Sequence, residues 1–249
     1  MNFNKPLLIT KLKATGVHMS LSLVVFVYLA YQIYFNWYPQ PYFSIDGGWQ
    51  GIRLVGAVDL VLGPFITFLI FDLRKSRRAI LFDLMTITVI QMSALAYGVY
   101  TTYSQRPVAI VLIDEFAVST IAQNYGDQLA SLQQLEQYSD EKPPIIYASF
   151  PLSREALAEI QERTVKEKVP MYAQLELYQS RSEFTNALKA QQILFMERMA
   201  AFKEIDKFND WLQQNQKARE NVLVMRFSGR YGSAWLVFDL EGKYRSYFR

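Results

Sequence analysis

Three long, predominantly apolar stretches constrain what this chain can fold into. Residues 14–45 contain no Asp, Glu, Lys or Arg, and no charge occurs between Asp83 and Arg106. Between them, residues 54–71 are apolar apart from a few positions, among them Asp59 and the pair Gly63–Pro64. A helix needs about 20 apolar residues to cross a bilayer. The sequence therefore predicts a membrane protein with three transmembrane helices within residues 17–103, followed by a separate domain in residues 104–249.

The positive charges flanking these stretches predict their orientation. Three Lys precede the first stretch, Arg53 alone lies between the first and second, and four Lys or Arg lie between the second and third. Cytoplasmic loops carry the excess of positive charge. We expect the basic lead 1–16 and the loop 72–79 in the cytoplasm, and the hairpin 37–53 and residues 104–249 in the periplasm, with the spans in a bacterial inner membrane.

A cleaved signal peptide would have a similar outline to the first stretch. No small-x-small cleavage site follows it, and the bulky segment "YQIYFNWYPQP" is typical of an interfacial aromatic belt. We therefore expect an uncleaved transmembrane helix.

Residues 104–249 have the composition of a soluble domain, with 18 Lys or Arg and 19 Asp or Glu. Runs rich in β-formers predict strands at 106–114, 115–121 and 143–150. Ser153 is a predicted N-cap for a helix that Pro170 stops, and Ser180 with Glu183 has capping-box spacing before one long helix over 180–216. Three short strands are predicted at the C-terminus, with turns at Gly229/Gly232 and at 241–243. The fold class is periplasmic α+β.

The predicted helix over 180–216 carries an apolar stripe on one face. It faces the domain core, or it forms a docking face for a partner. Its members are Phe184, Leu188, Phe195, Met199, Phe202, Ile205, Phe208 and Leu212.

The composition excludes several kinds of chemistry. The chain has no Cys and one His, His18, which excludes thiolate metal sites, Cys nucleophiles and His-based triads. A net charge of +3 is too small to imply nucleic acid. The glycines of "SGRYGS" resemble a phosphate-binding turn, but no helix follows, so we expect a hairpin turn. We predict no enzyme activity, no cofactor and no metal.

Asp59 is the most unusual residue of the predicted spans. An ionised Asp at mid-helix costs about 2.5–3.5 kcal/mol on insertion scales, so it normally faces other helices. Residues at similar depth on the neighbouring spans are Tyr31, Gln32, Ser93 and Tyr97. Asp59 and Pro64 fix how the three helices pack, or they line a lateral groove for a partner's transmembrane helix, or they belong to an ion or proton path.

An aspartyl dyad of Asp59 with Asp83 is disfavoured, because the two differ by roughly 13 Å in depth at 1.5 Å per residue. We expect Asp83 beside the basic loop. His18 is interpreted as an interfacial polar residue, or alternatively as a proton sensor.

The hairpin "WYPQPYFSIDGGWQGIR" is rich in aromatic residues. It anchors the protein at the membrane surface, or it forms an aromatic lip that receives a partner emerging from the bilayer.

The order of these pieces resembles the TfpX/TfpZ-type type IV pilin accessory proteins of Gram-negative bacteria. The resemblance is carried by "WYPQPYFSIDGGW", "VDLVLGPFITFLIF", a basic loop with "FDL", and "QMSALAYGVYTTYSQRPVAIVL", and it is close over residues 10–116. It implies a non-enzymatic chaperone that assists one type IV pilin, together with other pilus assembly proteins. The second half would select the pilin.

We expect nine residues to form the partner-binding site: Trp37, Tyr38, Trp49, Gly56, Asp59, Gly63, Pro64, Asp83 and Tyr97. The alternative is a membrane-anchored periplasmic sensor or ligand-binding module, which a pocket in 104–249 would favour. A cell-envelope enzyme would need an acid/base pair there, and no motif suggests one.

Overall fold

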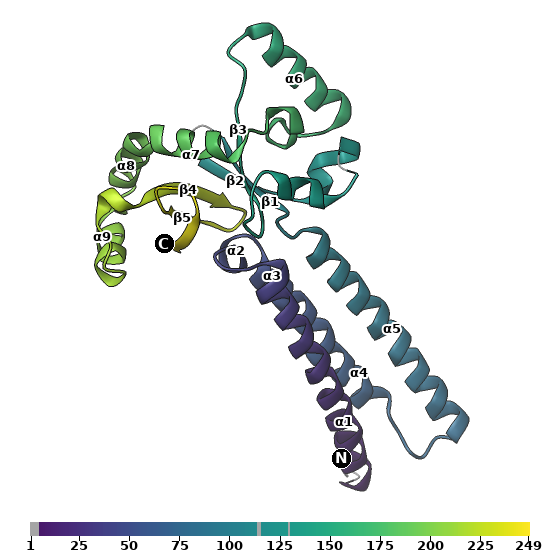
Figure 1. Cartoon of the computed structure of the whole chain (residues 1–249). Coiled ribbons are helices and arrows are strands. Elements are labelled where there is room, and N and C mark those ends of the chain that lie inside the picture. The colour runs from purple at the N-terminus through teal and green to yellow at the C-terminus, as the bar shows by residue number, and fades with distance from the viewer. Residues whose placement is uncertain (1–4, 114–115, 129) are drawn as a thin grey trace. The chain divides into compact units, whose positions relative to one another are not determined.

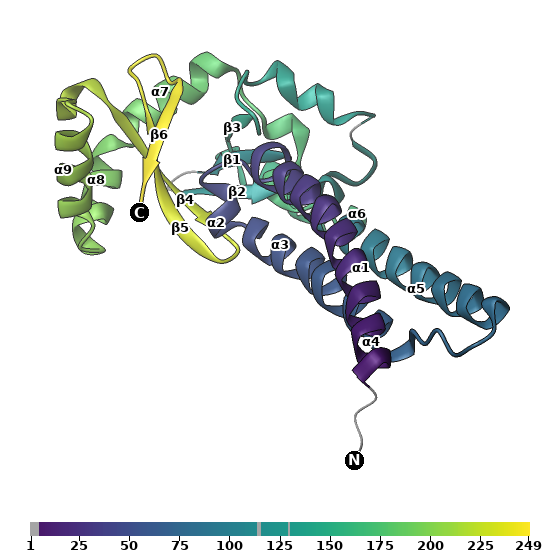
Figure 2. The ribbon, with the colours of Figure 1, turned by 90° about the horizontal axis from the view of Figure 1, so that it is seen from below.

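A computed structural model describes residues 5–113, 116–128 and 130–249. The chain forms two compact units. A helical unit contains the chain up to Phe43 and Gly47–Ser104, and a sheet unit contains Ser44–Asp46 and Gln105–Arg249. Figures 1 and 2 show the ribbon in two views. The first residues of the predicted basic lead, and Asp114 and Glu115 at two predicted strand ends, lie outside the described residues.

The helical unit contains three long apolar helices, as the sequence predicts. The first is α1 (Lys5–Tyr31), which continues as the π-helix η1 (Gln32–Trp37). The second joins α3 (Gly48–Gly56), the π-helix η2 (Ala57–Leu62) and α4 (Gly63–Ile70), and the third is α5 (Arg77–Ser104). All three are long and apolar enough to cross a membrane.

The second helix begins earlier than the sequence indicates. We predicted its start near residue 54, but α3 begins at Gly48, and a short helix α2 (Tyr42–Ile45) precedes it. Gly47 adopts φ 118°, a conformation that favours glycine. A Cβ at Gly48 would clash with Phe43 and Tyr38. The predicted hairpin 37–53 is therefore partly helical because two glycines allow a tight turn directly before the helix.

The second helix packs against both of its neighbours. Val55, Asp59, Gly63 and Thr67 follow one another at intervals of four residues on one face of this helix, and all four are buried. A buried apolar cluster holds this packing at one end of the helical unit, and the Tyr38 hydroxyl donates to the carbonyl of Thr102 at 3.0 Å beside it. The buried members of the cluster are Leu29, Ile33, Tyr38, Val55 and Leu95.

The sheet unit is built on one mixed six-stranded sheet in the order β3-β1-β2-β4-β5-β6. Strand β1 pairs in parallel with β3, and β2 pairs in parallel with β4, while the remaining neighbours are antiparallel. All six strands lie where the sequence predicts strands. Their bounds are β1 Ala109–Ile113, β2 Phe116–Thr120, β3 Ile145–Ala148, β4 Leu223–Gly229, β5 Gly232–Phe238 and β6 Tyr244–Phe248.

Two predicted helix caps of the sheet unit are confirmed. Ser153 accepts the backbone N–H of Ala156 and begins α6 (Arg154–Glu167). Ser180 and Glu183 form a complete capping box before α7 (Arg181–Ala190). Single-turn or slightly longer 3₁₀ helices connect the elements: η3 (Ala122–Gln128), η4 (Leu132–Gln137), η5 (Met171–Ala173), η6 (Leu175–Leu177) and η7 (Arg219–Asn221).

The prediction of one long helix over 180–216 is wrong. The segment forms α7, α8 (Gln192–Ala201) and α9 (Ile205–Gln214). Lys203 adopts φ 56°, which ends α8. The chain changes direction between these three helices. The members of the apolar stripe are buried in the core, except for Ile205, which is partly buried, and Phe202, which is 50 % exposed. The core-facing interpretation of the stripe is therefore confirmed, apart from Phe202.

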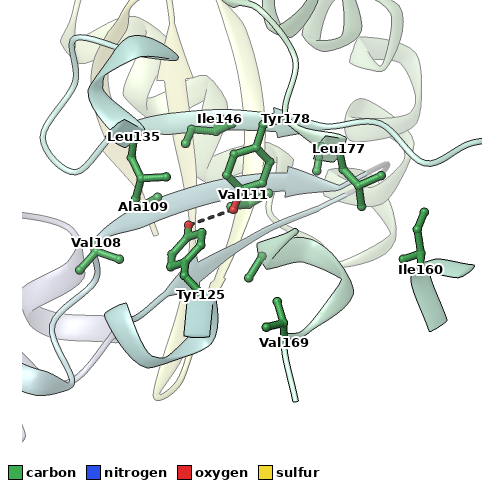
Figure 3. Packing of buried hydrophobic residues seen from close by; sticks show 12 residues of the cluster. Val108, Ala109, Val111, Tyr125, Leu135, Ile146, Ile160, Val169, Leu177 and Tyr178 are labelled. Atoms are coloured by element: carbon green, nitrogen blue, oxygen red, sulfur yellow. Dashed lines mark hydrogen bonds between the residues drawn. The ribbon is translucent and has the colours of Figure 1, made fainter. Parts of the chain in front are cut away.

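A second core cluster surrounds two tyrosines, as Figure 3 shows. The hydroxyl groups of Tyr125 and Tyr178 lie 2.9 Å apart, and Thr120 lies 2.9 Å from Tyr125. The Tyr178 hydroxyl also donates to the carbonyl of Tyr172 at 3.0 Å. Burial raises the pKa of Tyr125 to about 12 and raises the pKa of Tyr178 as well. The two buried hydroxyl groups are thus hydrogen-bonded inside an apolar cluster.

Candidate functional site

Asp59 is buried at a point where the three long helices of the helical unit meet. Its side chain is on η2, and the residue is 2 % exposed. Gln91 Nε2, from α5, donates to Asp59 Oδ1 at 2.8 Å and to Ser22 Oγ of α1 at 3.2 Å. We call Ser22, Asp59 and Gln91 the polar centre. A single amide group therefore links all three helices.

None of the four residues that the sequence places at a depth similar to that of Asp59 is its described hydrogen-bond partner, which is Gln91. Tyr31 and Tyr97 are 55 % and 69 % exposed, Ser93 is exposed, and Gln32 bonds within its own helix. Depth alone does not give the direction of a side chain. On α5 the buried residues are four apart, at Gln91 and Leu95, so a helix with 3.6 residues per turn directs Tyr97 elsewhere.

Gly63 and Pro64 shape the polar centre. A Cβ at Gly63 would collide with the carboxamide of Gln91, so only glycine permits this close approach. The N–H of Gly63 donates to the carbonyl of Val58, five residues earlier, and Pro64 follows in the first turn of α4. The π-helix containing Asp59 thus ends at Leu62, directly before Gly63 and Pro64, and π-helical turns occur frequently at functional sites.

One of the two carboxylate oxygens of Asp59 accepts no hydrogen bond from the described residues. Among the described residues, Asp59 Oδ2 is buried and has no hydrogen-bond partner. Leaving a buried acceptor unsatisfied costs about 1–3 kcal/mol. The polar centre is therefore sensitive to any change that removes its remaining donor, Gln91.

A second polar contact joins α1 to the second long helix, four residues before Ser22 on α1 and eight residues after Asp59 on the other. His18 Nδ1 lies 2.5 Å from Thr67 Oγ1, and Thr67 is 3 % exposed. His18 and Ser22 lie on one face of α1, and Thr67 continues the face of Asp59. His18 thus lies inside α1, which begins at Lys5, and contacts another helix.

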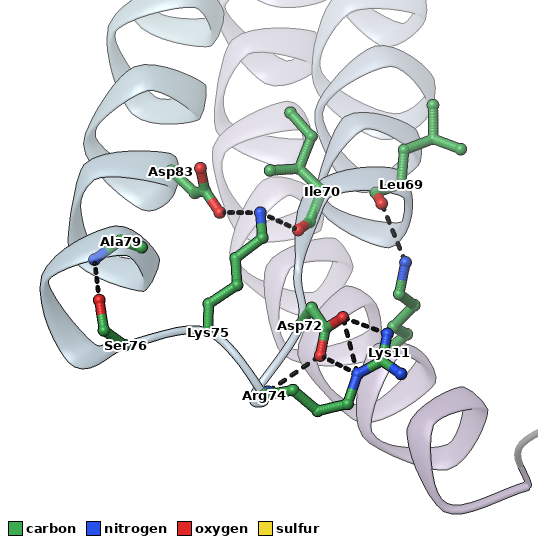
Figure 4. Close-up of polar contacts among 9 residues, drawn as sticks. All are labelled: Lys11, Leu69, Ile70, Asp72, Arg74, Lys75, Ser76, Ala79 and Asp83. Atoms are coloured by element: carbon green, nitrogen blue, oxygen red, sulfur yellow. Dashed lines mark hydrogen bonds and ion pairs between the residues drawn. The ribbon is translucent and has the colours of Figure 1, made fainter.

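Charged residues gather at the other end of the helical unit, as Figure 4 shows. Lys11 Nζ donates to the carbonyl of Leu69, and Lys75 Nζ contacts Asp83 at 2.5 Å. Asp83 therefore lies beside the basic loop, as expected. Hydrogen bonds from Arg74 lower the pKa of Asp72 to about 2.

The aromatic candidates separate into buried and exposed residues. Tyr38 is 1 % exposed, and Trp37 contacts the ring of Tyr103 edge-on at 5.1 Å. Trp49 is 48 % exposed, with the guanidinium of Arg53 5.9 Å from its ring.

Gly56 belongs to the helix packing. A Cβ there would lie 3.1 Å from the ring of Phe26. Of the nine candidates, Asp59, Gly63 and Pro64 lie around the polar centre, Tyr38 is buried elsewhere in the helical unit, and Trp49 and Tyr97 are the most accessible.

The sequence did not indicate a second buried carboxylate, in the sheet unit. Asp46 Oδ1 accepts hydrogen bonds from Ser119 Oγ at 3.0 Å, from the backbone N–H of Arg230 at 3.1 Å and from Arg230 Nε at 3.3 Å. Asp46 is fully buried. Burial raises its pKa, and Arg230 and Ser119 oppose that rise.

The hairpin turn between β4 and β5 contacts Asp46 and the residue before it. Tyr231 N–H donates to the carbonyl of Ile45 at 2.8 Å, and a Cβ at Gly229 would lie 2.5 Å from the same oxygen. The segment "SGRYGS" is thus a hairpin turn, as predicted, and it also binds Ser44–Asp46. The sequence signals that could have indicated this contact were Asp46 in "SIDGG" and Arg230 between the glycines of "SGRYGS".

Comparisons with known proteins identify the family. The family model "Fimbrial assembly protein FimB" matches residues 6–47, which include η1, Asp46 and all of α1 except Lys5. Three fimbrial assembly proteins of Dichelobacter nodosus are 39 % identical over 108 residues, or 43 % of this chain. The match covers 82 % of the protein of serogroups C1 and C2, and 42 % of those of serogroups E1 and I.

No solved structure matches the chain. The extent of the match to the protein of serogroups C1 and C2 is sufficient to assign the family. The chain belongs to the family of fimbrial assembly proteins.

Proposed function

We propose that this protein is a membrane-anchored, non-enzymatic chaperone for a type IV pilin, which it stabilises before and during pilus assembly. The observation that carries the proposal is the position of the family match. Residues 6–47 form the first long apolar helix and the residues that follow it up to Gly47. The segment that defines the family is therefore the one that would lie in and just outside a membrane.

The charge distribution supports an arrangement in the bacterial inner membrane with the sheet unit in the periplasm. Lys11, Arg74 and Lys75 lie at one end of the helical unit, where Lys11 and Lys75 contact the last turn of α4. Positive charge concentrates on the cytoplasmic side of membrane proteins. The opposite end of each long helix leads to aromatic residues, which favour the outer interface.

Such a chaperone would cover the apolar helix of an unassembled pilin. A pilin awaiting polymerisation has an apolar helix without its filament neighbours. The helical unit offers apolar helix surface in the membrane, and the sheet unit offers a folded surface for the pilin head. Association of helices in lipid depends on close packing and polar contacts.

The burial of the nine candidates supports different roles for them. The polar centre and its neighbours Gly63 and Pro64 are buried inside the helical unit, which supports a role in fixing helix packing. Trp49 and Tyr97 are accessible, which supports contact with the pilin.

Gene deletion and complementation test the proposal. We expect the deletion strain to have few surface pili and reduced pilin, and expression of the chain to restore both. A strain in which pilin and pili are unchanged would contradict the proposed function. Complementation by a variant lacking residues 105–249 would assign the activity to the helical unit alone.

A second candidate function rests on a pocket in the sheet unit. A pocket of about 560 Å³ lies between α8 and the start of β4, where Ile193, Met196, Val222 and Leu223 line it. This favours a periplasmic ligand-binding module. Thermal unfolding of the full chain with and without added lipids and peptides tests it, since a ligand that binds the native state raises the Tm.

A further inference from the structure

Four cations lie around the loop between α4 and α5, and two of them are neutralised by nearby acids. Arg74 Nη2 lies 2.6 Å from Asp72 Oδ2, and Lys75 Nζ lies 2.5 Å from Asp83 Oδ2. Lys75 also donates to the carbonyl of Ile70 at 3.2 Å, as Figure 4 shows. We call Arg74 and Lys75 the paired cations, because each already has an acid of its own.

The other two cations, Arg77 and Arg78, are the first residues of α5, and both are exposed. Among the described residues, neither of their side chains makes an ion pair or a hydrogen bond. The sequence from Arg77 up to Asp114 holds one acid, Asp83, which is bonded to Lys75. We call Arg77 and Arg78 the free arginines. Two positive charges at the start of α5 therefore have no counter-charge in the described part of the chain.

Each free arginine is followed by an exposed apolar side chain one helical turn further along α5. Leu81 comes four residues after Arg77 and is 59 % exposed, and Phe82 comes four residues after Arg78 and is 71 % exposed. Residues four apart lie on the same face of a helix, about 6 Å apart along its axis. This surface of α5 thus presents guanidinium groups at the end of the helix and apolar groups directly after them.

We propose that the free arginines bind the phosphate of an anionic phospholipid whose acyl chains lie along Leu81 and Phe82. In the proposed orientation, the start of α5 lies at the cytoplasmic surface of the membrane, where anionic headgroups attract basic residues. A guanidinium forms two parallel hydrogen bonds to a phosphate. The phosphate supplies the counter-charge that the described residues lack. The inference rests on the proposed membrane insertion and orientation, and not on the fimbrial role.

The uncompensated charge selects between two classes of headgroup. A zwitterionic lipid such as phosphatidylcholine carries its phosphate together with a cation of its own. An anionic lipid such as phosphatidylglycerol carries the phosphate without that cation, so it complements two free positive charges better. We therefore expect the site to prefer anionic headgroups over zwitterionic ones.

Native mass spectrometry of the purified full chain tests this proposal, with phosphatidylglycerol and phosphatidylcholine added in equal amounts. We expect the wild type to retain several-fold more phosphatidylglycerol than phosphatidylcholine. The double substitution Arg77→Gln and Arg78→Gln should abolish most of this preference. The double substitution Arg77→Lys and Arg78→Lys keeps both charges, so it should keep part of the preference.

The paired cations provide a matched control. The double substitution Arg74→Gln and Lys75→Gln removes two positive charges from the same loop, and we expect it to leave most of the preference in place. Because it also leaves Asp72 and Asp83 without their ion pairs, thermal unfolding of each variant checks that it is folded. The Lys variant of the free arginines changes no charge and provides a second, independent comparison.

Three outcomes would overturn the proposal: no preference for phosphatidylglycerol in the wild type, an unchanged preference after Gln replaces the free arginines, or equal losses in the two Gln variants. Equal losses would assign the preference to the net charge of the loop. Failure of the underlying membrane insertion is visible separately, because the chain would then be missing from the membrane fraction before any lipid is added. Pilus number in cells that express the variants reports the fimbrial role independently.

Discussion

Arg230 contacts Asp46 from a position 184 residues later in the chain, with its backbone N–H and its Nε both directed at Asp46 Oδ1. Both residues belong to the sheet unit. Arg230 also donates to the carbonyl of Asp46 at 2.8 Å and to the side-chain oxygen of Gln105 at 2.9 Å. One side chain thus joins the turn between β4 and β5 to two distant segments.

Replacing Arg230 by Ala is expected to destabilise the sheet unit. Asp46 is buried, and removing the partner of a buried charge costs up to about 3–5 kcal/mol. Arg230 is itself one third exposed, so we expect a smaller loss, about 1–3 kcal/mol after screening. Chemical denaturation of the full chain in detergent measures it, with Arg245→Ala, in an exposed pair, as the control. Equal effects of the two substitutions would contradict the account.

The effect of Arg230→Ala should depend on pH. Burial raises the pKa of Asp46, so its stability contribution is complete below the unfolded pKa and declines as pH rises through the folded pKa. Removing Arg230 raises that pKa further. The stability difference between wild type and variant should therefore be large at neutral pH and shrink in acid. A difference independent of pH would exclude Asp46 as its cause.

The polar centre gives a prediction for the helical unit. Gln91→Leu removes the only described donor to Asp59, and we expect about 1–3 kcal/mol of destabilisation from the unsatisfied carboxylate. Thermal unfolding in detergent measures it, with Ser93→Ala, an exposed position of α5, as the control.

We also expect Asp59→Leu to lower the amount of pilin or the number of pili while the protein still inserts. Unchanged pilin in that strain would limit Asp59 to a role in packing.

The tyrosine pair predicts alkaline sensitivity. The pKa of Tyr125 rises to about 12 in the folded state, against about 10 for an unperturbed Tyr. A raised pKa contributes stability that is lost as pH rises, here between about pH 10 and pH 12. Denaturation midpoints of the full chain over this range should fall less steeply for Tyr125→Phe than for wild type. Tyr231→Phe, which is exposed, should behave as wild type.

Exchange of residues 104–249 with those of a relative tests which half selects the pilin. We expect the chimaera to support the relative's pilin and no longer its own, because the sheet unit would contact the variable pilin head. Piliation in strains that carry each pilin measures this. Unchanged preference would assign recognition to the long helices.

Strong local signals predicted much of this fold. Apolar length predicted the three long helices, and side-chain chemistry predicted the caps at Ser153 and Ser180. The helix end at Lys203 was not predictable, because this C-cap position with its positive φ is usually occupied by Gly and here carries Lys. The partners Gln91 and Arg230 were also missed. A single sequence indicates the membrane depth of Gln91 and places Arg230 in a turn. It does not indicate the direction of either side chain, or a contact between residues 184 positions apart.

Site-specific photocrosslinking in living cells tests the central claim most directly. A photoreactive residue at Trp49, which is accessible, is compared with one at Leu240, an exposed residue of the sheet unit. The crosslinked protein is identified by mass spectrometry. We expect the fimbrial subunit to crosslink to position 49 in strains that make pili. Adducts with lipid alone, or with proteins unrelated to fimbriae, would contradict the proposal that this chain binds the subunit at the membrane.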